Sequence, residues 1–188
     1  MIIREATDDD FENGIWPIFH EIVKEGETYA YPMTCTKEEG KHYWMEYPRK
    51  TFVFIDDDDD ADKDNDDVVG DKPRKPKILG TYYIKTNQIE HGSGDHVCNC
   101  GYMVSSTARG KGIATLLCEH SQHQALELGY KAMQYNFVAS TNVGAVKLWQ
   151  KLGYDIVGTL PKAFHSPNHG YVDAYVMYKW LVAESESE

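Results

Sequence analysis

Apolar residues near the start of the chain are spaced first as in a strand and then as in a helix. Residues 2–6 favour a short strand, and Thr7 with the three aspartates after it supplies the oxygen atoms that begin a helix. Gly26 predicts the end of this helix, and Pro17 predicts a break or kink inside it. Residues 36–39 match a capping box, which predicts a second helix. We therefore expect one strand and two helices at the start of the fold.

The rest of the chain alternates strand-like and helix-like runs. Short β-favouring runs predict strands, and longer runs with helical spacing and a closing glycine predict helices. The order βααβββαβαββ, with an insertion after the second strand, predicts a mixed α/β fold and a single domain over residues 1–182. The later strands are expected at residues 51–55, 78–85, 97–104, 132–138, 154–159 and 171–180, and the later helices at 112–129 and 142–152.

Acidic residues are concentrated in one segment, which changes the meaning of the net charge. The 188 residues carry a formal charge of −11, but residues 56–67 alone hold nine aspartates and one lysine. We expect residues 56–76 to form a disordered acidic insertion and residues 183–188 an acidic tail. The remainder is close to neutral, which argues against nucleic-acid binding. A match to a calcium loop starts at Asp60 but lacks the turn glycine and the final glutamate, so no metal is expected.

The sequence also limits the compartment and the partners. It has no apolar run of about 18 residues to span a bilayer, and its first residues lack the order of a secretory signal. We expect a cytoplasmic protein, with the nucleus as the alternative, and no membrane partner; a homodimer is left open. The four cysteines lack the spacing of a disulfide framework or a zinc site and are expected to be buried thiols. They are Cys35, Cys98, Cys100 and Cys118.

A glycine-rich turn stands between a predicted strand and a predicted helix. Residues 109–114 read Arg-Gly-Lys-Gly-Ile-Ala, and small residues there let main-chain N–H groups converge at a helix N-terminus, where a phosphate is favoured. Arg109 and Lys111 add positive charge. A Walker motif is absent, and position 115 is threonine, which excludes the GxGxxG dinucleotide fingerprint. The turn therefore predicts an anion site of another class.

Two blocks of residues resemble the GNAT acetyltransferases. Arg109-x-x-Gly112-x-Ala114 is similar to the acyl-CoA motif of that family, and residues 142–154 are similar to its second CoA-contacting block. The resemblance covers nearly the whole chain apart from the acidic insertion and the last few residues. It implies a central, mostly antiparallel sheet that is splayed between its fourth and fifth strands and has helices on both faces.

The resemblance also implies how acetyl-CoA binds, as a co-substrate and without a metal. Main-chain amides of the turn would hold the pyrophosphate, and Met103 and Val104 would lie beside the pantetheine arm, with a free N–H near Val104 for an oxyanion. Many members carry a tyrosine that protonates the thiolate where this chain has Trp149, whose indole is not an acid. Another proton donor is then needed, or none, because a thiolate leaves readily near neutral pH. The expected cofactor-binding residues are Met103, Val104, Arg109, Gly110, Lys111, Gly112, Ile113, Ala114, Asn142 and Trp149.

A narrower resemblance concerns the acceptor. Residues 97–104 and 132–142 are similar to the fungal L-azetidine-2-carboxylate N-acetyltransferases and their bacterial relatives, in which an asparagine on each splayed strand faces the substrate. Asn99 and Asn136 occupy those positions and are the expected catalytic residues. An amide both donates and accepts hydrogen bonds, so the pair suits a small zwitterion. The alternative is that the two amides only hold the strands together.

The loop after the first helix matches the region that shapes the acceptor pocket in the family. Thr28, Tyr29 and Tyr31 are the expected substrate-binding residues, with plain packing as the alternative. Acetylation also needs a base or a water chain, because an amino acid nitrogen is mostly protonated at pH 7. The candidate bases are Glu27, Tyr175, His165 and His169, of which the two histidines are expected in a loop that can close over the acceptor.

The resulting hypothesis is direct transfer, in a ternary complex, of an acetyl group from acetyl-CoA to a small-molecule amine, an amino or imino acid. A ping-pong route through Cys98, Cys100 or Cys118 lacks a histidine at a recognisable spacing. Two other functions stay open. The chain can be a protein or peptide N-acetyltransferase, or a catalytically silent CoA-binding module.

Overall fold

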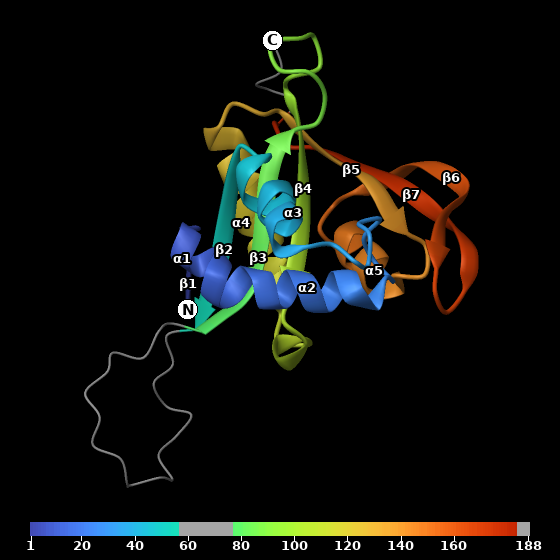
Figure 1. The fold of residues 1–188 in the computed structure, drawn as a ribbon. Coiled ribbons are helices and arrows are strands. Elements are labelled where there is room, and N and C mark those ends of the chain that lie inside the picture. Colours follow the sequence, from blue (N-terminus) through green and yellow to red (C-terminus); the bar gives the residue numbers. More distant parts are fainter. Residues whose placement is uncertain (57–76, 184–188) are drawn as a thin grey trace, which may run out of the picture.

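The computed structural model describes residues 1–56 and 77–183, and it arranges their strands in one sheet (Figure 1). The strand order is β1-β2-β3-β4-β5-β7-β6, and every neighbouring pair is antiparallel except β4 and β5, which are parallel. The expected mixed α/β fold with a mostly antiparallel sheet is confirmed. The strands are β1 (Ile2–Glu5), β2 (Lys50–Asp56), β3 (Lys77–Thr86), β4 (Val97–Val104), β5 (Ala132–Ala139), β6 (Asp155–Ser166) and β7 (Gly170–Trp180).

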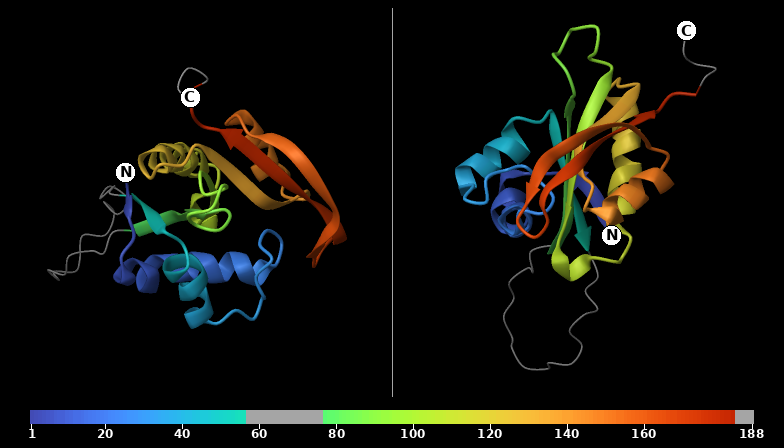
Figure 2. Two further views of the ribbon diagram at one scale, coloured as in Figure 1. Left: turned by 90° about the horizontal axis from the view of Figure 1, so that it is seen from above. Right: turned by 90° about the vertical axis from the view of Figure 1, so that its right-hand side faces the viewer.

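Helices cover both faces of this sheet, as expected (Figure 2). The helices α2 and α3 pack on one face over an apolar cluster that includes Phe19, Trp44 and Met103, while α4 and α5 pack on the other face over a cluster that includes Leu117 and Trp149. None of the described helices is long and apolar enough to cross a bilayer. The helices are α1 (Asp8–Asp10), α2 (Trp16–Glu25), α3 (Lys37–Lys41), α4 (Ile113–Glu127) and α5 (Val143–Lys151).

The predicted helix starts near the N-terminus are confirmed by their caps. The Thr7 hydroxyl accepts from the Asp10 N–H, and the Asp10 carboxylate accepts from the Thr7 N–H, which completes a capping box. Residues 36–39 form a second one. The irregularity expected at Pro17 is present: the proline lies in the first turn of α2, directly after a π-helical turn at Phe11–Ile15 where the regular α-helical hydrogen-bond pattern is interrupted.

The strand β6 differs from the prediction, whereas β7 lies where it was expected. The sequence predicts that β6 ends at residue 159, but the strand continues to Ser166, because Pro161 lies at an irregularity between Leu160 and Phe164 where the ladder is already interrupted. The expected loop position of His165 is therefore wrong, since this residue lies in β6 opposite Tyr171. Most of the acidic insertion, the calcium-loop match that starts at Asp60 and nearly all of the acidic tail lie outside the described residues.

Candidate active site

The sheet opens between its two parallel strands. β4 and β5 pair only at Val97–Ala132 and Cys98–Met133, after which no further partners join them within the described chain. On its other edge β5 stays paired with β7, with an irregularity between Tyr135 and Val138. The expected splay between the fourth and fifth strands is confirmed. It leaves main-chain groups of β4 facing a gap, where another molecule can pair with them.

The direction of those main-chain groups follows from the hydrogen bonds around the gap. The Tyr102 carbonyl oxygen accepts from the Tyr29 hydroxyl at 2.8 Å, so it points into the gap and not toward β3. Backbone groups of a strand alternate in direction, and residues two apart point the same way. The Val104 N–H therefore also faces the gap. Ser105 fits this alternation, because its N–H donates to the Leu79 carbonyl at the start of β3.

The glycine-rich turn follows β4 and presents free main-chain donors. Gly110 and Gly112 both have φ of +79°, a left-handed conformation that suits glycine, and a Cβ added at either would meet no atom within 4 Å. The Arg109 N–H donates to the Ser106 carbonyl, and the Thr115 N–H donates to that of Gly112. Between these two bonds, the amides of residues 110–114 have no acceptor among the described residues. Five successive N–H groups thus remain available at the N-terminus of α4.

A cavity of about 560 Å³ extends from this turn to the gap, and we call it the turn cavity. Nine of the ten residues expected to bind the cofactor line it. Lys111 does not line it and is exposed. The Arg109 guanidinium lies 3.6 Å from the Glu25 carboxylate, so part of its charge is already paired. The turn cavity is lined by Met103, Val104, Arg109, Gly110, Gly112, Ile113, Ala114, Asn142 and Trp149, among others.

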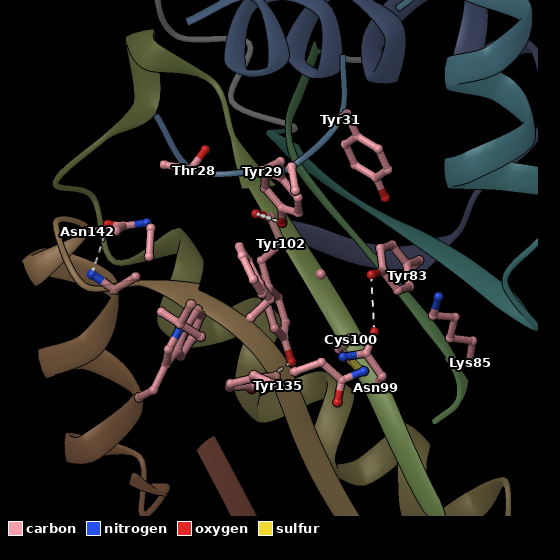
Figure 3. Close-up of a pocket in the computed structure, with 18 residues that line it drawn as sticks. Thr28, Tyr29, Tyr31, Tyr83, Lys85, Asn99, Cys100, Tyr102, Tyr135 and Asn142 are labelled. Atoms are coloured by element: carbon pink, nitrogen blue, oxygen red, sulfur yellow. Dashed lines mark hydrogen bonds between the residues drawn. The ribbon is translucent and has the colours of Figure 1, made fainter. Parts of the chain in front are cut away.

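A second cavity of about 350 Å³ lies on the far side of the gap, and we call it the tyrosine cavity (Figure 3). All five residues expected to act on or bind the acceptor line it: Thr28, Tyr29, Tyr31, Asn99 and Asn136. The two cavities share part of their lining and therefore meet at the gap. The shared residues are Thr28, Tyr29, Tyr102, Asn142, Ala145 and Trp149.

Asn99 lies where the two strands separate. Its Nδ2 donates to the Gln134 carbonyl of β5 at 2.9 Å, and its Oδ1 accepts from the Tyr83 hydroxyl at 3.1 Å. The side chain thus bridges the strands one residue past their last pairing and helps to hold them together. Nδ2 still carries a second proton and Oδ1 a second lone pair, so the amide can also bind a ligand in the cavity.

Asn136 lies on β5 in the irregular stretch opposite β7 and is exposed. Its Oδ1 accepts from Gln134 Nε2 at 2.8 Å, and its Nδ2 donates to Asn87 Oδ1 at 2.7 Å. Asn87 follows β3, so this pair of amides links β5 to the segment after β3. Asn99 and Asn136 both line the tyrosine cavity, one buried at its floor and one at its rim.

The loop after α2 brings its tyrosines to the gap. Tyr29 stacks on Tyr31 with ring centroids 5.6 Å apart, and Tyr31 stacks on Tyr43 at 5.0 Å. Burial raises the pKa of Tyr31 to about 12, with Cys35 and Tyr43 adding to the shift. The hydroxyls are therefore neutral hydrogen-bonding groups at pH 7, and the loop combines packing with polar contacts.

Thr28 has an unsatisfied side chain at the junction of the two cavities. Its Oγ1 is buried and has no hydrogen-bond partner among the described residues. Buried hydroxyls are nearly always paired, so this one fits a site that a polar ligand completes. Together with the free amides at residues 110–114 and the open glycine turn, it shows that the residues present suit an extended ligand with a phosphate at one end and amides along its length.

None of the four candidate bases lines the tyrosine cavity, although His165 lines a neighbouring cavity of about 450 Å³ that shares Tyr29, Ala30 and Tyr31 with it. His165 packs on Tyr171 in the β6–β7 hairpin, and His169 is in the exposed turn of that hairpin. The Glu27 carboxylate accepts from Ser166 Oγ at 2.7 Å and from Asn168 Nδ2 at 2.9 Å, so it ties the hairpin to the loop after α2. No His, Asp or Glu is among the described residues that line the tyrosine cavity.

The thiols and Trp149 take structural positions. All four cysteines are free and buried, as expected. Burial raises the pKa of the Cys100 thiol well above its ordinary value, which disfavours the thiolate that a ping-pong route needs. Trp149 packs on Tyr102 at 5.0 Å and on Tyr135 at 5.2 Å. Within the described residues no cluster of three His, Cys, Asp or Glu side chains could hold a metal ion.

Sequence reasoning missed two residues of β3 that line the tyrosine cavity, Tyr83 and Lys85. Both lie on the same face of β3, and the register places Lys85 opposite Asn99 and Tyr83 opposite Gly101. A Cβ at Gly101 would lie 2.6 Å from the Tyr83 ring, so the glycine makes room for this tyrosine. The strand pattern of residues 78–85 puts Tyr83 and Lys85 on one face, but the register that faces them toward Asn99 is not visible in the sequence.

The comparison with protein families agrees with this geometry. Residues 16–154, more than half of the chain, match the family model described as acetyltransferase (GNAT) family. The chain belongs to the GNAT family. As a GNAT protein it is an acetyltransferase, and the narrower resemblance to a fungal group is also supported. The N-acetyltransferase aca1 of Schizosaccharomyces pombe is 29% identical over 155 residues, which are 82% of this chain and 72% of that protein.

Solved structures of GNAT proteins have the same fold. A GCN5-related N-acetyltransferase from Kribbella flavida is 37% identical, with a TM-score of 0.80 over 95% of this chain and 96% of its own. The structure of yncA from Salmonella typhimurium with its cofactor acetyl-CoA is 16% identical, with a TM-score of 0.75 over 100% of this chain and 98% of its own. The second likeness concerns the fold alone.

Proposed function

We propose that this GNAT enzyme acetylates a small amino or imino acid by direct transfer from acetyl-CoA in a ternary complex. The observation that carries the proposal is the meeting of two cavities at the gap between β4 and β5. One cavity ends at free main-chain amides, and the other is lined by asparagines and tyrosines. Such a pair of cavities suits a donor and an acceptor that must be present together.

The turn cavity is the proposed binding site of the donor. The free amides of residues 110–114 would hold the pyrophosphate, because main-chain N–H groups at a helix N-terminus bind phosphate. Val104 would pair with the pantetheine arm as with a neighbouring strand. When bound, acetyl-CoA supplies a thioester whose acetyl group passes to the acceptor nitrogen. The Tyr102 N–H faces the gap on the same side as its own carbonyl, lies closer to Asn99 than the Val104 N–H does, and would donate to the thioester carbonyl oxygen as negative charge develops there.

The tyrosine cavity is the proposed binding site of the acceptor. Its volume of about 350 Å³ lies near the lower end of the range for small-molecule sites, which favours a compact acceptor over a peptide segment. Asn99 would orient the acceptor through the donor and acceptor capacity that its strand contacts leave free, and Asn136 would do so from the rim. Thr28, Tyr29 and Tyr31 would form the wall opposite β4.

Proton removal is proposed to run through water. The acceptor nitrogen must be neutral to react, and the described lining of the tyrosine cavity contains no His, Asp or Glu to take its proton. Burial keeps the Tyr31 hydroxyl neutral, with its pKa at about 12, and so it would not act as a base at pH 7. A water chain through the open rim can carry the proton to solvent.

A screen of amines tests the proposal. The protein is incubated with acetyl-CoA and, separately, with amino acids, imino acids including L-azetidine-2-carboxylate, simple amines and short peptides, and CoA release is followed. We expect the fastest release with a small amino or imino acid. Faster release with peptides would show a peptide N-acetyltransferase instead. No release with any acceptor, together with retained CoA binding, would show a silent CoA-binding module.

A further inference from the structure

Lys85 brings a charge into a cavity that otherwise lacks one. Among the described residues that line the tyrosine cavity, it is the one charged side chain. It comes from β3 and lies half-buried next to Tyr83 and Asn99 (Figure 3). A half-buried lysine usually has a carboxylate partner, so its contacts decide what it can do.

The ammonium group of Lys85 contacts aromatic rings and not an anion. Its Nζ lies 4.5 Å from the centroid of the Tyr47 ring and 5.6 Å from that of the Tyr83 ring. Neither ring carries a charge that could neutralise it, although both faces attract a cation. Within residues 1–56 and 77–183, no Asp or Glu lies within ion-pair distance of Lys85. Burial alone lowers the pKa of Lys85, which agrees with the lack of a nearby carboxylate.

The other polar groups around Lys85 are already engaged. The Tyr29 hydroxyl donates to the Tyr102 carbonyl. The Tyr83 hydroxyl donates to Asn99 Oδ1. These two bonds help to fix the wall of the cavity. The three N–H donors of the Lys85 ammonium take part in neither bond and stay available to a ligand.

We propose that Lys85 binds the carboxylate of the acceptor and thereby selects amino and imino acids over amines without a carboxylate. This inference rests on the proposed function, since it names the group that recognises the acceptor. In the register of β3 and β4, Lys85 lies directly opposite Asn99, the residue at which the strands separate. In an α-amino or imino acid, one carbon atom separates the nitrogen from the carboxylate. A carboxylate on Lys85 therefore keeps the nitrogen near Asn99 and the gap.

The same contact distinguishes a free amino acid from a peptide. The first residue of a peptide has an amide where the free amino acid has its carboxylate, so it offers no anion at that distance from its nitrogen. A hydrogen-bonded contact between an ammonium and a carboxylate is stronger than one between neutral groups. Lys85 would then be a specificity-determining residue, while Asn99 and Asn136 orient the acceptor.

Matched acceptors and matched variants test this inference. Steady-state KM and kcat are measured with L-azetidine-2-carboxylate and with its carboxamide, for the wild type, Lys85→Met and Lys85→Arg. Losing one charge-assisted contact should raise KM for the acid by ~10- to 100-fold in Lys85→Met and leave KM for the carboxamide within about threefold. Lys85→Arg keeps the charge and should restore part of the loss. Lys77→Met is the control, because Lys77 is an exposed lysine at the other end of β3 and lines neither cavity.

Several results would overturn the inference. Equal losses with the acid and the carboxamide would show that Lys85 only supports Tyr47 and Tyr83. Equal use of both acceptors by the wild type would show that no carboxylate is recognised, while N-acetylation itself would stand. If no turnover is seen, binding of L-azetidine-2-carboxylate to the CoA-bound protein is measured by calorimetry instead. Absent binding, or equal binding by the wild type and Lys85→Met, would contradict the role of Lys85. Failure of the proposed function is seen separately, as no CoA release with any amine.

Discussion

The turn cavity and the tyrosine cavity meet at one gap but are built from different parts of the protein. The turn cavity presents main-chain amides of a single continuous segment, residues 110–114, which glycines at positive φ keep open. The tyrosine cavity presents side chains from β3, β4, β5 and the loop after α2. The donor side therefore depends on a local backbone shape, whereas the acceptor side depends on the register of three strands.

The largest expected effect comes from closing the turn cavity. Gly112→Val places a β-branched side chain in a left-handed conformation and fills the space that the turn leaves open. We expect the KM for acetyl-CoA to rise by ~100-fold, because charged hydrogen bonds to the amides are lost. Steady-state kinetics with acetyl-CoA varied measures this.

Gly129→Val is the matched control for that substitution. Gly129 has φ of +90° and, like Gly112, no atom within 4 Å of an added Cβ, but it follows α4 at its other end. Both variants carry a similar backbone cost, measured as a lower melting temperature. A similar rise in KM for acetyl-CoA in Gly129→Val would show that lost stability, and not a blocked turn, explains the effect.

The next effect in size is expected from a substitution that displaces Tyr83 on the acceptor side. Gly101→Ala puts a Cβ 2.6 Å from the Tyr83 ring, which must move and break its hydrogen bond to Asn99. We expect kcat with the acceptor to fall by ~10- to 100-fold while KM for acetyl-CoA stays unchanged, and overpacking to cost about 1–3 kcal/mol of stability. Gly158→Ala in β6 is the control, since its Cβ would meet only ordinary contacts at 3.8 Å. An unchanged kcat in Gly101→Ala would contradict the role given to the Tyr83 position.

Substitution of either asparagine should lower turnover, but only substitution of Asn99 should also lower the stability of the protein. Asn99→Ala and Asn136→Ala should each lower turnover with L-azetidine-2-carboxylate by at least ~10-fold, as for loss of a transition-state contact. Asn99→Ala should also lose about 1–3 kcal/mol of stability, because it leaves the half-buried Gln134 carbonyl and the buried Tyr83 hydroxyl without their partner. Asn136 is exposed, so its removal should leave the melting temperature nearly unchanged. Full turnover in both variants would refute their assignment.

The smallest expected effect is a pH dependence of ligand binding. Burial lowers the pKa of Lys85 from its ordinary value of 10.5, so the ammonium loses its charge at a lower pH than a free lysine does. The groups that face it are the rings of Tyr47 and Tyr83 and the amide of Asn99, and burial raises the pKa of Tyr83 well above 10. Affinity for a carboxylate should therefore fall as pH rises through the Lys85 pKa.

This fall in affinity is best measured with the N-acetylated product as the ligand, because its nitrogen no longer titrates. Calorimetry on the CoA-bound protein between about pH 7 and pH 10 should show weakening affinity in the wild type and a flat profile in Lys85→Arg, whose guanidinium stays charged. Parallel profiles in the two proteins would assign the titration to another group.

The sequence predicts the donor side better than the acceptor side for a physical reason. Glycines at positions 110 and 112, followed by a helix, determine the turn within a few residues, so local chemistry predicts its free amides. The order of strands and helices follows equally from local patterns. Lys85 and Tyr83 reach the site only because β3 pairs with β4 in one register, and a shift of one residue would turn them to the other face.

One local error has the same origin. Pro161 is locally unfavourable in a strand, but the ladder irregularity in β6 accommodates it. His165 lies in a strand and not in a loop because β6 continues past Pro161. These outcomes depend on pairing and packing, which the pattern of a single segment does not contain.

A crystal structure of the protein with CoA and an acceptor amino acid would show whether the two cavities bind the donor and the acceptor. We expect the diphosphate on the amides of residues 110–114, the thiol in the gap between β4 and β5 near Tyr102, where the two cavities meet, and the acceptor in the tyrosine cavity. A diphosphate bound away from the turn, or a thiol outside that gap, would contradict the assignment of the two cavities to donor and acceptor.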